Sequence, residues 1–306
     1  MEQAAAADRT SYAEGAAFVE GQFVPVAEAR VPILDWGFLR SDATYDVAHV
    51  WRGSFFRLED HLDRFERGME RLRMSLPYGR DEIRDVLVEC VRLSGLRDAY
   101  AEIICTRGVP PPGSRDPRDC KNNFFAFVVP FVWIADPDKQ VRGLHATIGR
   151  VQRIQSESVD PTVKNYHWLD LEVGLYEAYE RGGETVILVD WDENVVEGPG
   201  FNVFAVKDGG AFTPSRGVLE GITRKTVIEL AAELGIPLEV RPVPADEVRA
   251  ADEVFISSTA GGVIPVTTVD GKPVGAGEPG PVTWRLREAY WDLHRDPRFT
   301  LPVRYD

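Results

Sequence analysis

The chain has 306 residues, in which 35 lysines and arginines are outnumbered by 49 aspartates and glutamates, so its formal charge is −14 at pH 7. This acidic balance argues against a nucleic-acid-binding protein, whose contact surface would be basic. With 44% hydrophobic and 27% charged residues the composition is that of a globular protein, and the length suggests about two domains at roughly 150 residues each.

Neither a membrane span nor a metal site is expected. No apolar stretch approaches the ~20 residues that cross a bilayer, and residues 1–14 lack the pattern of a signal peptide, so we expect a cytoplasmic protein. The three cysteines, Cys90, Cys105 and Cys120, form no CxxC pair, and the five histidines have no ligand spacing. We therefore expect buried or incidental thiols, no disulfide framework and no bound metal.

The first half of the chain predicts hairpins followed by helices. Residues 1–16 suggest a flexible arm, and turns at Gly21 and Gly53 join strand-like runs into two hairpins. A helix is expected after Asp60, a candidate N-cap, and a second helix should end at Gly95. Two further strand-like runs, 100–106 and 124–132, complete a predicted small N-terminal α/β domain, 17–133, with a mixed sheet and two helices.

The second half alternates β-branched runs with helical patterns. A polar, proline-bearing segment, 134–142, is the candidate interdomain linker, and 143–306 the larger C-terminal domain. Gly235 suits the residue just after a helix. The expected strands are 184–189, 203–206 and 253–256, and the expected helices are 168–181, 223–234 and 281–294. The fold class predicted is α/β in two domains, an α+β small domain and a larger mixed α/β domain.

Lys164 is the candidate nucleophile among six lysines. The other five lie in polar or turn contexts or beside an arginine at a helix start, whereas strand-like and aromatic residues surround Lys164. Burial favours a neutral amine, which is the form that makes a Schiff base. The alternative is a lysine whose stem covers an aromatic surface while its amine reaches water.

Three further features are ambiguous when each is taken alone. The glycine-rich turn 217–226 opens a helix whose N–H groups suit a phosphate, or it is an ordinary turn with Thr223 as N-cap. Glu197 ends an apolar run and would hold a heteroaromatic nitrogen protonated, or it faces solvent. Arg64 lies beside the apolar face of the first helix and is either a phosphate ligand or a surface cation.

Taken in order, these segments resemble the fold-type IV pyridoxal-phosphate enzymes. The similarity runs from about Ala17 to the end of the chain, and it is strongest to the (R)-selective amine transaminases. More distant similarity is to branched-chain and D-amino-acid aminotransferases. The matching segments are Asp160-Pro-Thr-Val-Lys-Asn165, Ser41-Asp-Ala-Thr-Tyr-Asp46, Phe55-Phe-Arg-Leu-Glu-Asp-His61, Glu197-Gly-Pro-Gly-Phe-Asn202, Gly221-Ile-Thr-Arg224 and Ser258-Thr-Ala-Gly-Gly262.

The resemblance implies a pyridoxal 5′-phosphate site between the two domains. Lys164 would form the Schiff base and move the proton between substrate and cofactor, and Glu197 would pair with the ring nitrogen. The remaining cofactor-binding residues implied are Arg64, Gly221, Ile222, Thr223, Ser258 and Thr259. The implied substrate pocket comprises Arg40, Tyr45, Arg115, Trp168, Gly200, Phe201 and Ala260.

Three departures from the family pattern bear on the substrate. Arg40 stands where amine transaminases often have histidine, so an additional cation would face the substrate and favour amino or keto acids. Pro199 replaces the usual serine in Gly-Ser-Gly and removes a hydroxyl and an N–H. Residues 153–158 also differ from familiar members. The assignment of Arg115, as a mobile arginine that pairs with a keto-acid carboxylate, rests on a shifted loop.

The function expected is a ping-pong transaminase that moves an amino group from a primary amine, of (R) configuration by resemblance, to a keto acid such as pyruvate. A branched-chain or D-amino-acid aminotransferase is the alternative, followed by an aminodeoxychorismate-type lyase, which would release pyruvate without an amino acceptor. A binding protein of the same fold without catalysis would fail to take up the cofactor. The resemblance also implies a homodimer with shared active sites.

Overall fold

The computed structural model describes residues 12–306, so most of the predicted arm, residues 1–11, lies outside the described residues. The chain divides into two compact units. Of the described residues, the first contains 12–132, together with Val163–Tyr166 and His294–Asp306. The second contains Trp133–Thr162 and His167–Leu293.

The first unit is built on an antiparallel seven-stranded sheet. Its strand order is β16 (Thr300–Pro302), β4 (Ser54–Phe56), β3 (Ala43–Trp51), β5 (Ala99–Thr106), β6 (Asn123–Pro130), β1 (Ala16–Val19) and β2 (Gln22–Pro25). Every neighbouring pair is antiparallel, so the expectation of a mixed sheet was wrong for this half. Both predicted hairpins are present. Their two-residue turns, Glu20-Gly21 and Arg52-Gly53, have positive φ throughout, as type I′ turns require.

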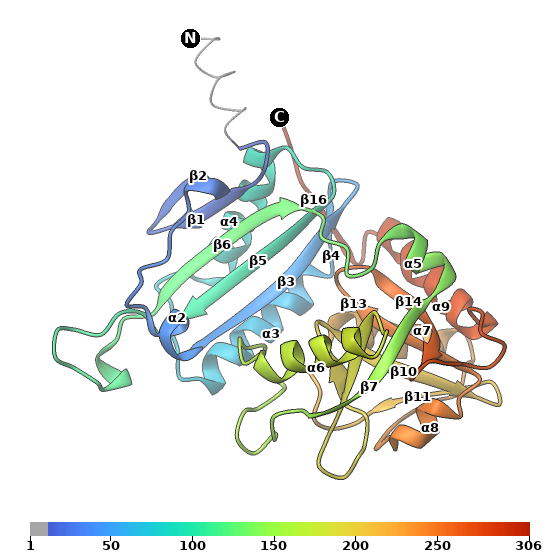
Figure 1. Cartoon of the computed structure of the whole chain (residues 1–306). Coiled ribbons are helices and arrows are strands. Elements are labelled where there is room, and N and C mark those ends of the chain that lie inside the picture. Colours follow the sequence, from blue (N-terminus) through green and yellow to red (C-terminus); the bar gives the residue numbers. More distant parts are fainter. Residues whose placement is uncertain (1–11) are drawn as a thin grey trace. The chain divides into compact units, whose positions relative to one another are not determined.

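Two helices cover one face of this sheet, namely α3 (Leu58–Arg71) and α4 (Arg80–Ser94), as Figure 1 shows. Shorter elements are η1 (Val26–Glu28), α2 (Trp36–Arg40) and η2 (Pro117–Asp119). Along β5 the residues at 99, 101 and 103 join the hydrophobic core with the helices. Since side chains alternate along a strand, Tyr100 and Glu102 point to the opposite face. Tyr45, which pairs with Ile104 of β5, lies on that face as well.

The ends of the two helices test the sequence signals. α4 ends at Gly95, which has the left-handed φ of 70° that the glycine predicted. α3, however, begins at Leu58 with Arg57 as its N-cap, so the prediction of Asp60 as N-cap was wrong. Asp60 lies in the first turn of the helix, where its carboxylate accepts a hydrogen bond from Arg57 Nε at 2.5 Å.

The second unit contains a nine-stranded mixed sheet. The main order is β12 (Leu238–Arg241), β11 (Gly210–Pro214), β10 (Phe201–Lys207), β13 (Glu253–Ser258), β14 (Gly262–Val269), β7 (Leu144–Gln152) and β8 (Thr185–Val189). In addition, β15 (Lys272–Pro273) pairs with β14 and β9 (Glu197–Gly198) with β10. The parallel pairs are β11–β12, β14–β7 and β7–β8. A mixed α/β domain was expected in this half.

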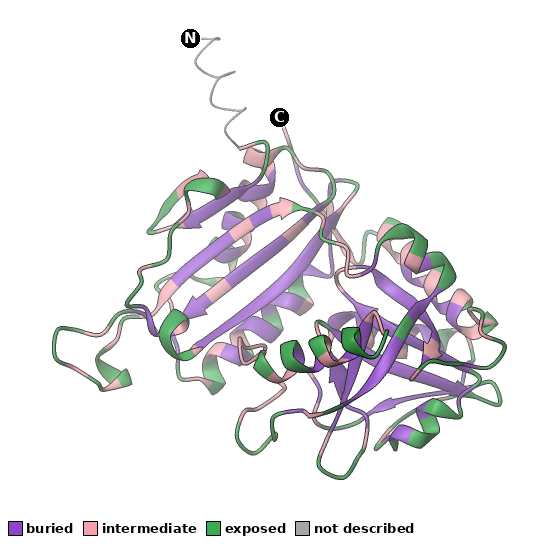
Figure 2. Cartoon of the chain, viewed as in Figure 1, coloured by how far each residue is buried: buried purple, intermediate pink, exposed green. Residues whose placement is uncertain are grey.

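The helices of the second unit pack on this sheet. α6 (Leu169–Glu180) lies against β7 and β8, whereas α7 (Ile222–Glu233) and α9 (Pro281–Asp292) pack together and against β13. The remaining elements are α8 (Ala245–Arg249) and η3 (Leu293–Arg295). Gly235 follows α7 with φ of 68°, as expected. In Figure 2 the strands are largely buried and α6 exposes most of its outer face.

The observed division of the chain differs from the expected one in three places. Residues 137–142 were placed in the predicted linker, but they form the helix α5 (Pro137–Arg142) of the second unit. The Asp136 side chain caps this helix by accepting a hydrogen bond from Lys139 N at 2.9 Å. The C-terminal residues 294–306 belong to the first unit, because β16 pairs with β4. Ala16 likewise belongs to β1 and not to an arm.

Membrane-crossing segments were searched for among residues 12–306. None of the helices there is both long and apolar enough to span a bilayer.

Candidate active site

Lys164 is held by its backbone on β3 of the first unit. Its carbonyl oxygen accepts hydrogen bonds from Tyr45 N at 3.1 Å and from Thr44 Oγ1 at 2.9 Å. Its amine nitrogen lies 4.4 Å from the centroid of the Tyr45 ring, and the residue is half-buried. The main chain is therefore fixed while the amine stands over an aromatic face. The structure thus brings Lys164 and Tyr45, both predicted site residues, together.

An aromatic and acidic cluster adjoins this lysine. The rings of Tyr45 and Tyr166 are stacked, with centroids 4.3 Å apart and planes within 1°. The Tyr166 hydroxyl donates to Glu102 Oε1 at 2.6 Å. Burial raises the pKa of Glu102, and the hydrogen bond from Tyr166 and the charge of Lys164 only partly oppose that rise. Glu102 as a whole is 7% exposed, and its carboxyl group interacts electrostatically with Lys164.

Arg64 is buried in the first unit, so the reading of it as a surface cation was wrong. Its Nε and Nη2 donate to the two carboxylate oxygens of Asp46 at 2.7 and 2.8 Å, and His61 Nδ1 lies 2.8 Å from the same carboxylate. Burial would raise the pKa of Asp46, but the charge and hydrogen bonds of Arg64 lower it well below its usual range. Burial also lowers the pKa of His61. A neutral His61 that donates a hydrogen bond to Asp46 is consistent with both shifts. The two hydrogen bonds to Asp46 fix the orientation of the Arg64 guanidinium.

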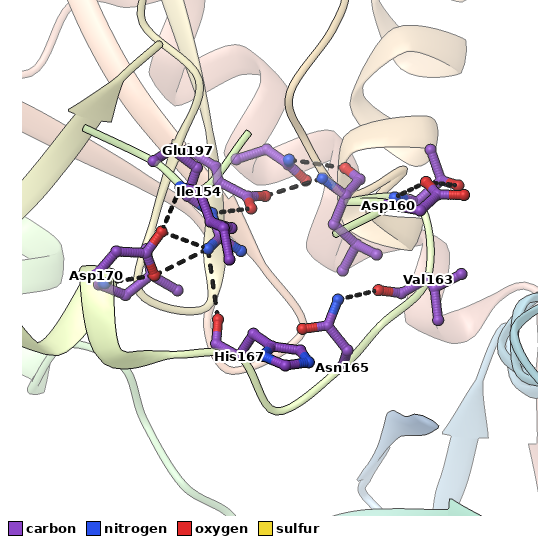
Figure 3. A network of polar contacts seen from close by, with 12 residues as sticks. Ile154, Asp160, Val163, Asn165, His167, Asp170 and Glu197 are labelled. Carbon is purple, nitrogen blue, oxygen red and sulfur yellow. Dashed lines mark hydrogen bonds and ion pairs between the residues drawn. The ribbon is translucent and has the colours of Figure 1, made fainter. Parts of the chain in front are cut away.

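Glu197 lies in the second unit within a network of buried polar groups. Its Oε1 accepts from Arg153 Nε at 3.2 Å and its Oε2 from Leu219 N at 2.9 Å. Arg153 Nη1 also donates to both oxygens of Asp170, at 2.9 and 2.7 Å; Figure 3 shows Asp170 and Glu197 on either side of this network. Burial would lower the pKa of Arg153, but the attraction of Glu197 and Asp170 raises it. Glu197 is 6% exposed, so the alternative of a solvent-facing turn was wrong.

The N-terminus of α7 occupies the predicted glycine-rich turn. Gly221 is the N-cap, and Ile222 and Thr223 follow in the first turn, both at most 5% exposed. The alternative of Thr223 as N-cap was therefore wrong. The first N–H groups of a helix have no partner within the helix and carry its positive dipole end. This terminus has the chemistry of a phosphate seat.

Gly221 is packed too closely for any side chain. A Cβ placed there would lie 2.1 Å from Asn202 Oδ1, and Asn202 Nδ2 donates to Leu219 O at 2.9 Å. Asn202 therefore fixes the turn that leads into α7. Because Leu219 N is the donor to Glu197, the same turn links the carboxylate to the helix terminus.

The other predicted residues of the second unit lie near the ends of β13 and β10. The Ser258 hydroxyl donates to Gly200 O at 2.8 Å and accepts from Ala260 N at 3.1 Å, so it holds a turn. Ala260 O accepts from Ile134 N. A Cβ on Gly200 would lie 3.8 Å from the Trp168 ring, so these two are neighbours. Phe201 is buried and Thr259 half-buried.

Two predicted pocket cations lie at the surface of the first unit. Arg40 ends α2, is exposed and stacks its guanidinium 3.4 Å from the centroid of the Trp36 ring. Arg115 is exposed in the loop that contains η2. The described contacts therefore give Arg40 a partner in Trp36, and the two roles proposed for these arginines stay predictions.

Sequence reasoning missed several residues of these clusters. Glu102 lies within an apolar strand, and only its pairing with Val47 and Phe127 places it on the face with Tyr45. Asp46 lies in a quoted segment, yet no role was assigned to it. Arg153 had been noted only as a departure from the family pattern. A charged residue inside an otherwise apolar run was the available signal for Glu102 and Asp46.

Comparisons with known proteins agree on one family. The family model described as amino-transferase class IV matches residues 43–269. A putative branched-chain-amino-acid aminotransferase of Methanocaldococcus jannaschii is 33% identical over 90% of this chain and 95% of that protein. A D-alanine aminotransferase of Staphylococcus haemolyticus is 29% identical over 89% and 95%, respectively.

Solved structures give the same result. The branched-chain amino acid aminotransferase of Thermobaculum terrenum, solved in its PLP form, has a TM-score of 0.86 at 28% identity and covers 96% of this chain and 99% of its own. The Escherichia coli branched-chain amino acid aminotransferase has a TM-score of 0.89 at 26% identity, covering 94% and 99%.

Proposed function

Because the chain belongs to the class IV aminotransferases, enzymes that use pyridoxal 5′-phosphate, we propose that it moves an amino group from a primary amine, of (R) configuration, to a keto acid such as pyruvate. Amino donors and keto acids are the substrates of the class. The choice of an amine without a carboxylate rests on one observation, the buried Glu102 beside Lys164.

The carboxyl group of Glu102 disfavours a substrate that carries a carboxylate. In neither protonation state does a carboxyl group supply the positive charge that a substrate carboxylate needs, and when ionised it repels one. The guanidinium of Arg40, the cation proposed to read a carboxylate, is stacked on Trp36. Tyr45 and Tyr166 add an aromatic wall beside the lysine. These features favour an apolar amine, and the likeness of residues 160–165 to (R)-amine transaminases supports the configuration.

The residues present fit the cofactor. The second unit contains a buried carboxylate, Glu197, which suits a protonated ring nitrogen. It also contains the helix N-terminus at Gly221, which suits a phosphate. When bound, pyridoxal phosphate supplies an electron sink that acidifies the Cα proton of the substrate. We assign Lys164 as the base that removes this proton and returns it at the neighbouring carbon of the cofactor.

The remaining assignments concern holding the cofactor. Glu197 would accept a hydrogen bond from the protonated ring nitrogen, while Arg64, fixed by Asp46, would supply a positive charge to the phosphate. Ile222 and Thr223 would donate backbone N–H groups to the same phosphate. Thr259 and Ser258 are the other candidates, although the hydroxyl of Ser258 already donates to Gly200 O.

A half-reaction assay tests the proposed substrate class. The purified enzyme, loaded with cofactor, is mixed separately with (R)-1-phenylethylamine, its (S) enantiomer, D-alanine and L-leucine, and the loss of the visible absorbance is followed. We expect the (R)-amine to bleach the enzyme fastest. Glu102→Gln, which removes the charge and keeps the shape, should raise the rate with D-alanine relative to the amine. A response to L-leucine alone would reject the proposal.

A second candidate is a branched-chain or D-amino-acid aminotransferase. It is favoured by the names of the relatives, which include branched-chain-amino-acid and D-alanine aminotransferases at about 30% identity. Under this candidate Arg115 or Arg40 would bind the substrate carboxylate. The same assay separates the two, because only this candidate predicts that Arg115→Ala reduces the response to an amino acid and leaves the response to 1-phenylethylamine unchanged.

We also propose that a second copy of the chain covers the exposed apolar residues. One face of α6 exposes Leu169, Val173 and Tyr176 by 82%, 55% and 69%, and in the first unit Ile33 and Phe38 are 73% and 67% exposed. Apolar side chains gathered in this way are typical of an interface. Sedimentation velocity should give twice the chain mass, and Tyr176→Lys should shift it toward one chain. A wild-type monomer would contradict the homodimer. The cytoplasmic location stays a prediction.

A further inference from the structure

The hydroxyl of Ser257 is a buried polar group that the described fold does not satisfy. Ser257 lies near the end of β13 and is 2% exposed. Its Oγ has no hydrogen-bond partner among residues 12–306. Buried hydroxyls nearly always have a partner, because leaving one unpaired costs free energy. This atom therefore needs a partner that the chain itself does not provide.

Ser257 belongs to a row of three polar side chains on one face of the larger sheet. Asn202 of β10 is directly opposite Glu197 of β9 on one side and opposite Ser257 of β13 on the other. Directly opposed residues in antiparallel strands point to the same face. Neighbouring strands are about 4.8 Å apart. The row thus has the carboxylate at one end and the unsatisfied hydroxyl at the other.

The middle of this row contacts the start of α7. Asn202 Nδ2 donates to Leu219 O at 2.9 Å, and its Oδ1 lies within 2.1 Å of where a Cβ of Gly221 would be. α7 has twelve residues and packs on β13. Ser257, one strand from Asn202, therefore lies on the face that the first turn of α7 covers. The neighbouring Ser258 points to the other face and uses its hydroxyl on Gly200 O.

We propose that Ser257 Oγ donates a hydrogen bond to the phosphate of pyridoxal 5′-phosphate, beside the N–H groups of Ile222 and Thr223. This inference rests on the proposed function, since it takes the N-terminus of α7 as the phosphate seat. A phosphate oxygen is an acceptor that a serine hydroxyl binds well, and an anion at a helix N-terminus is stabilised by the helix dipole. The proposal explains why a serine, and no apolar residue, occupies this buried position.

Comparing two ligands, one with and one without a phosphate, distinguishes a contact with the phosphate from a general effect on cofactor binding. The affinity of the cofactor-free enzyme is measured by fluorescence titration for pyridoxal 5′-phosphate and for pyridoxal, which lacks the phosphate. Ser257→Ala should weaken binding of the phosphorylated ligand about tenfold, as the loss of one charge-assisted hydrogen bond predicts, and leave pyridoxal unchanged. The ³¹P resonance of the bound cofactor should also shift. Equal loss for both ligands, or no loss for either, would overturn the proposal.

Two control variants distinguish this inference from the proposed function. Thr223→Val keeps its N–H and loses its hydroxyl, while Thr223→Pro removes the N–H within the first turn of α7. If Thr223→Pro weakens only the phosphorylated ligand and Ser257→Ala weakens neither, the phosphate seat stands and the role of Ser257 is rejected. If none of the variants discriminates between the ligands, the seat itself is wrong and the proposed function loses its cofactor site.

Discussion

Arg153 Nε lies 3.2 Å from Glu197 Oε1, and both side chains are buried. The same guanidinium binds Asp170, so one cation is shared between two carboxylates. A lone arginine would draw negative charge away from Glu197 and weaken it as an acceptor. With Asp170 present, the cation is shared between two carboxylates, which is compatible with the role proposed for Glu197 at the ring nitrogen of the cofactor.

Removing this cation should destabilise the fold. Arg153→Met leaves Glu197 and Asp170 without their shared partner, and breaking a buried ion pair in this way costs about 3 kcal/mol. Urea unfolding should show this loss, whereas Arg216→Met, which removes an arginine that is 59% exposed, should change the free energy of unfolding by less than about 0.5 kcal/mol. Equal stability of wild type and Arg153→Met would refute the structural role of the ion pair.

The Asp46–Arg64 pair predicts a specific dependence of stability on pH. The folded-state pKa of Asp46 lies below its unfolded value of about 3.9. Its stabilising effect is therefore complete above about pH 4 and is lost as the pH falls through the lower folded-state value. At pH 7 we expect Asp46→Asn to be about 3 kcal/mol less stable than wild type, because Arg64 stays buried without its charge partner.

The same comparison in acid tests this explanation. Between pH 4 and pH 2 the free energies of unfolding of wild type and Asp46→Asn should converge, because the wild type alone loses this contribution. Chemical denaturation at several pH values measures the difference. A gap that stays constant from pH 7 to pH 2 would show that the titration of Asp46 does not contribute.

The hydrogen bond between Tyr166 and Glu102 should be measurable in stability. Tyr166→Phe keeps the ring stacked on Tyr45 and removes the donor to a buried carboxyl group, which costs about 1–3 kcal/mol. Tyr179→Phe is the matched control, since Tyr179 is 52% exposed. We expect the control to differ from wild type by less than about 0.5 kcal/mol. Equal effects of the two substitutions would argue against a buried Glu102 that depends on Tyr166.

Gly221→Ala should weaken cofactor binding through the turn before α7. The added Cβ would overlap Asn202 Oδ1 at 2.1 Å and displace the side chain that holds Leu219. We expect the dissociation constant for pyridoxal 5′-phosphate to rise about tenfold, which corresponds to a loss of about 1.4 kcal/mol of binding free energy. Gly210→Ala is the control, because the nearest atom to its Cβ would lie at an ordinary 3.6 Å. Unchanged affinity in Gly221→Ala would show that the turn tolerates displacement.

Local signals predicted much of the fold. The periodic apolar residues and Gly95 placed α4 and its end, and the Gly21 and Gly53 turns placed both hairpins. Contacts between segments that are distant in the sequence could not be predicted from such local signals. Val163–Tyr166 joins the first unit because Lys164 O is bound by Tyr45 N, more than a hundred residues earlier, and no local pattern encodes that contact.

The candidate site shows the same limit. Lys164 and Glu197 stand in recognisable ordered segments, so resemblance located them. Glu102 and Ser257 depend on strand register, which decides the face that each side chain takes, and register follows from pairing across the whole sheet. Ser258 stood out in the sequence, yet its hydroxyl holds a turn, whereas the adjacent Ser257 carries the unsatisfied hydroxyl.

The assignment of Lys164 as the lysine that bonds to the cofactor is tested most directly by chemical fixation. The cofactor-loaded enzyme is reduced with borohydride, which makes the lysine–cofactor bond permanent, and its peptides are mapped by mass spectrometry. We expect the added mass of the phosphopyridoxyl group on the peptide that contains Lys164. A folded Lys164→Ala variant should carry no such label and should lose turnover. The label on any of the other five lysines, or a Lys164→Ala enzyme that still turns over, would contradict the account.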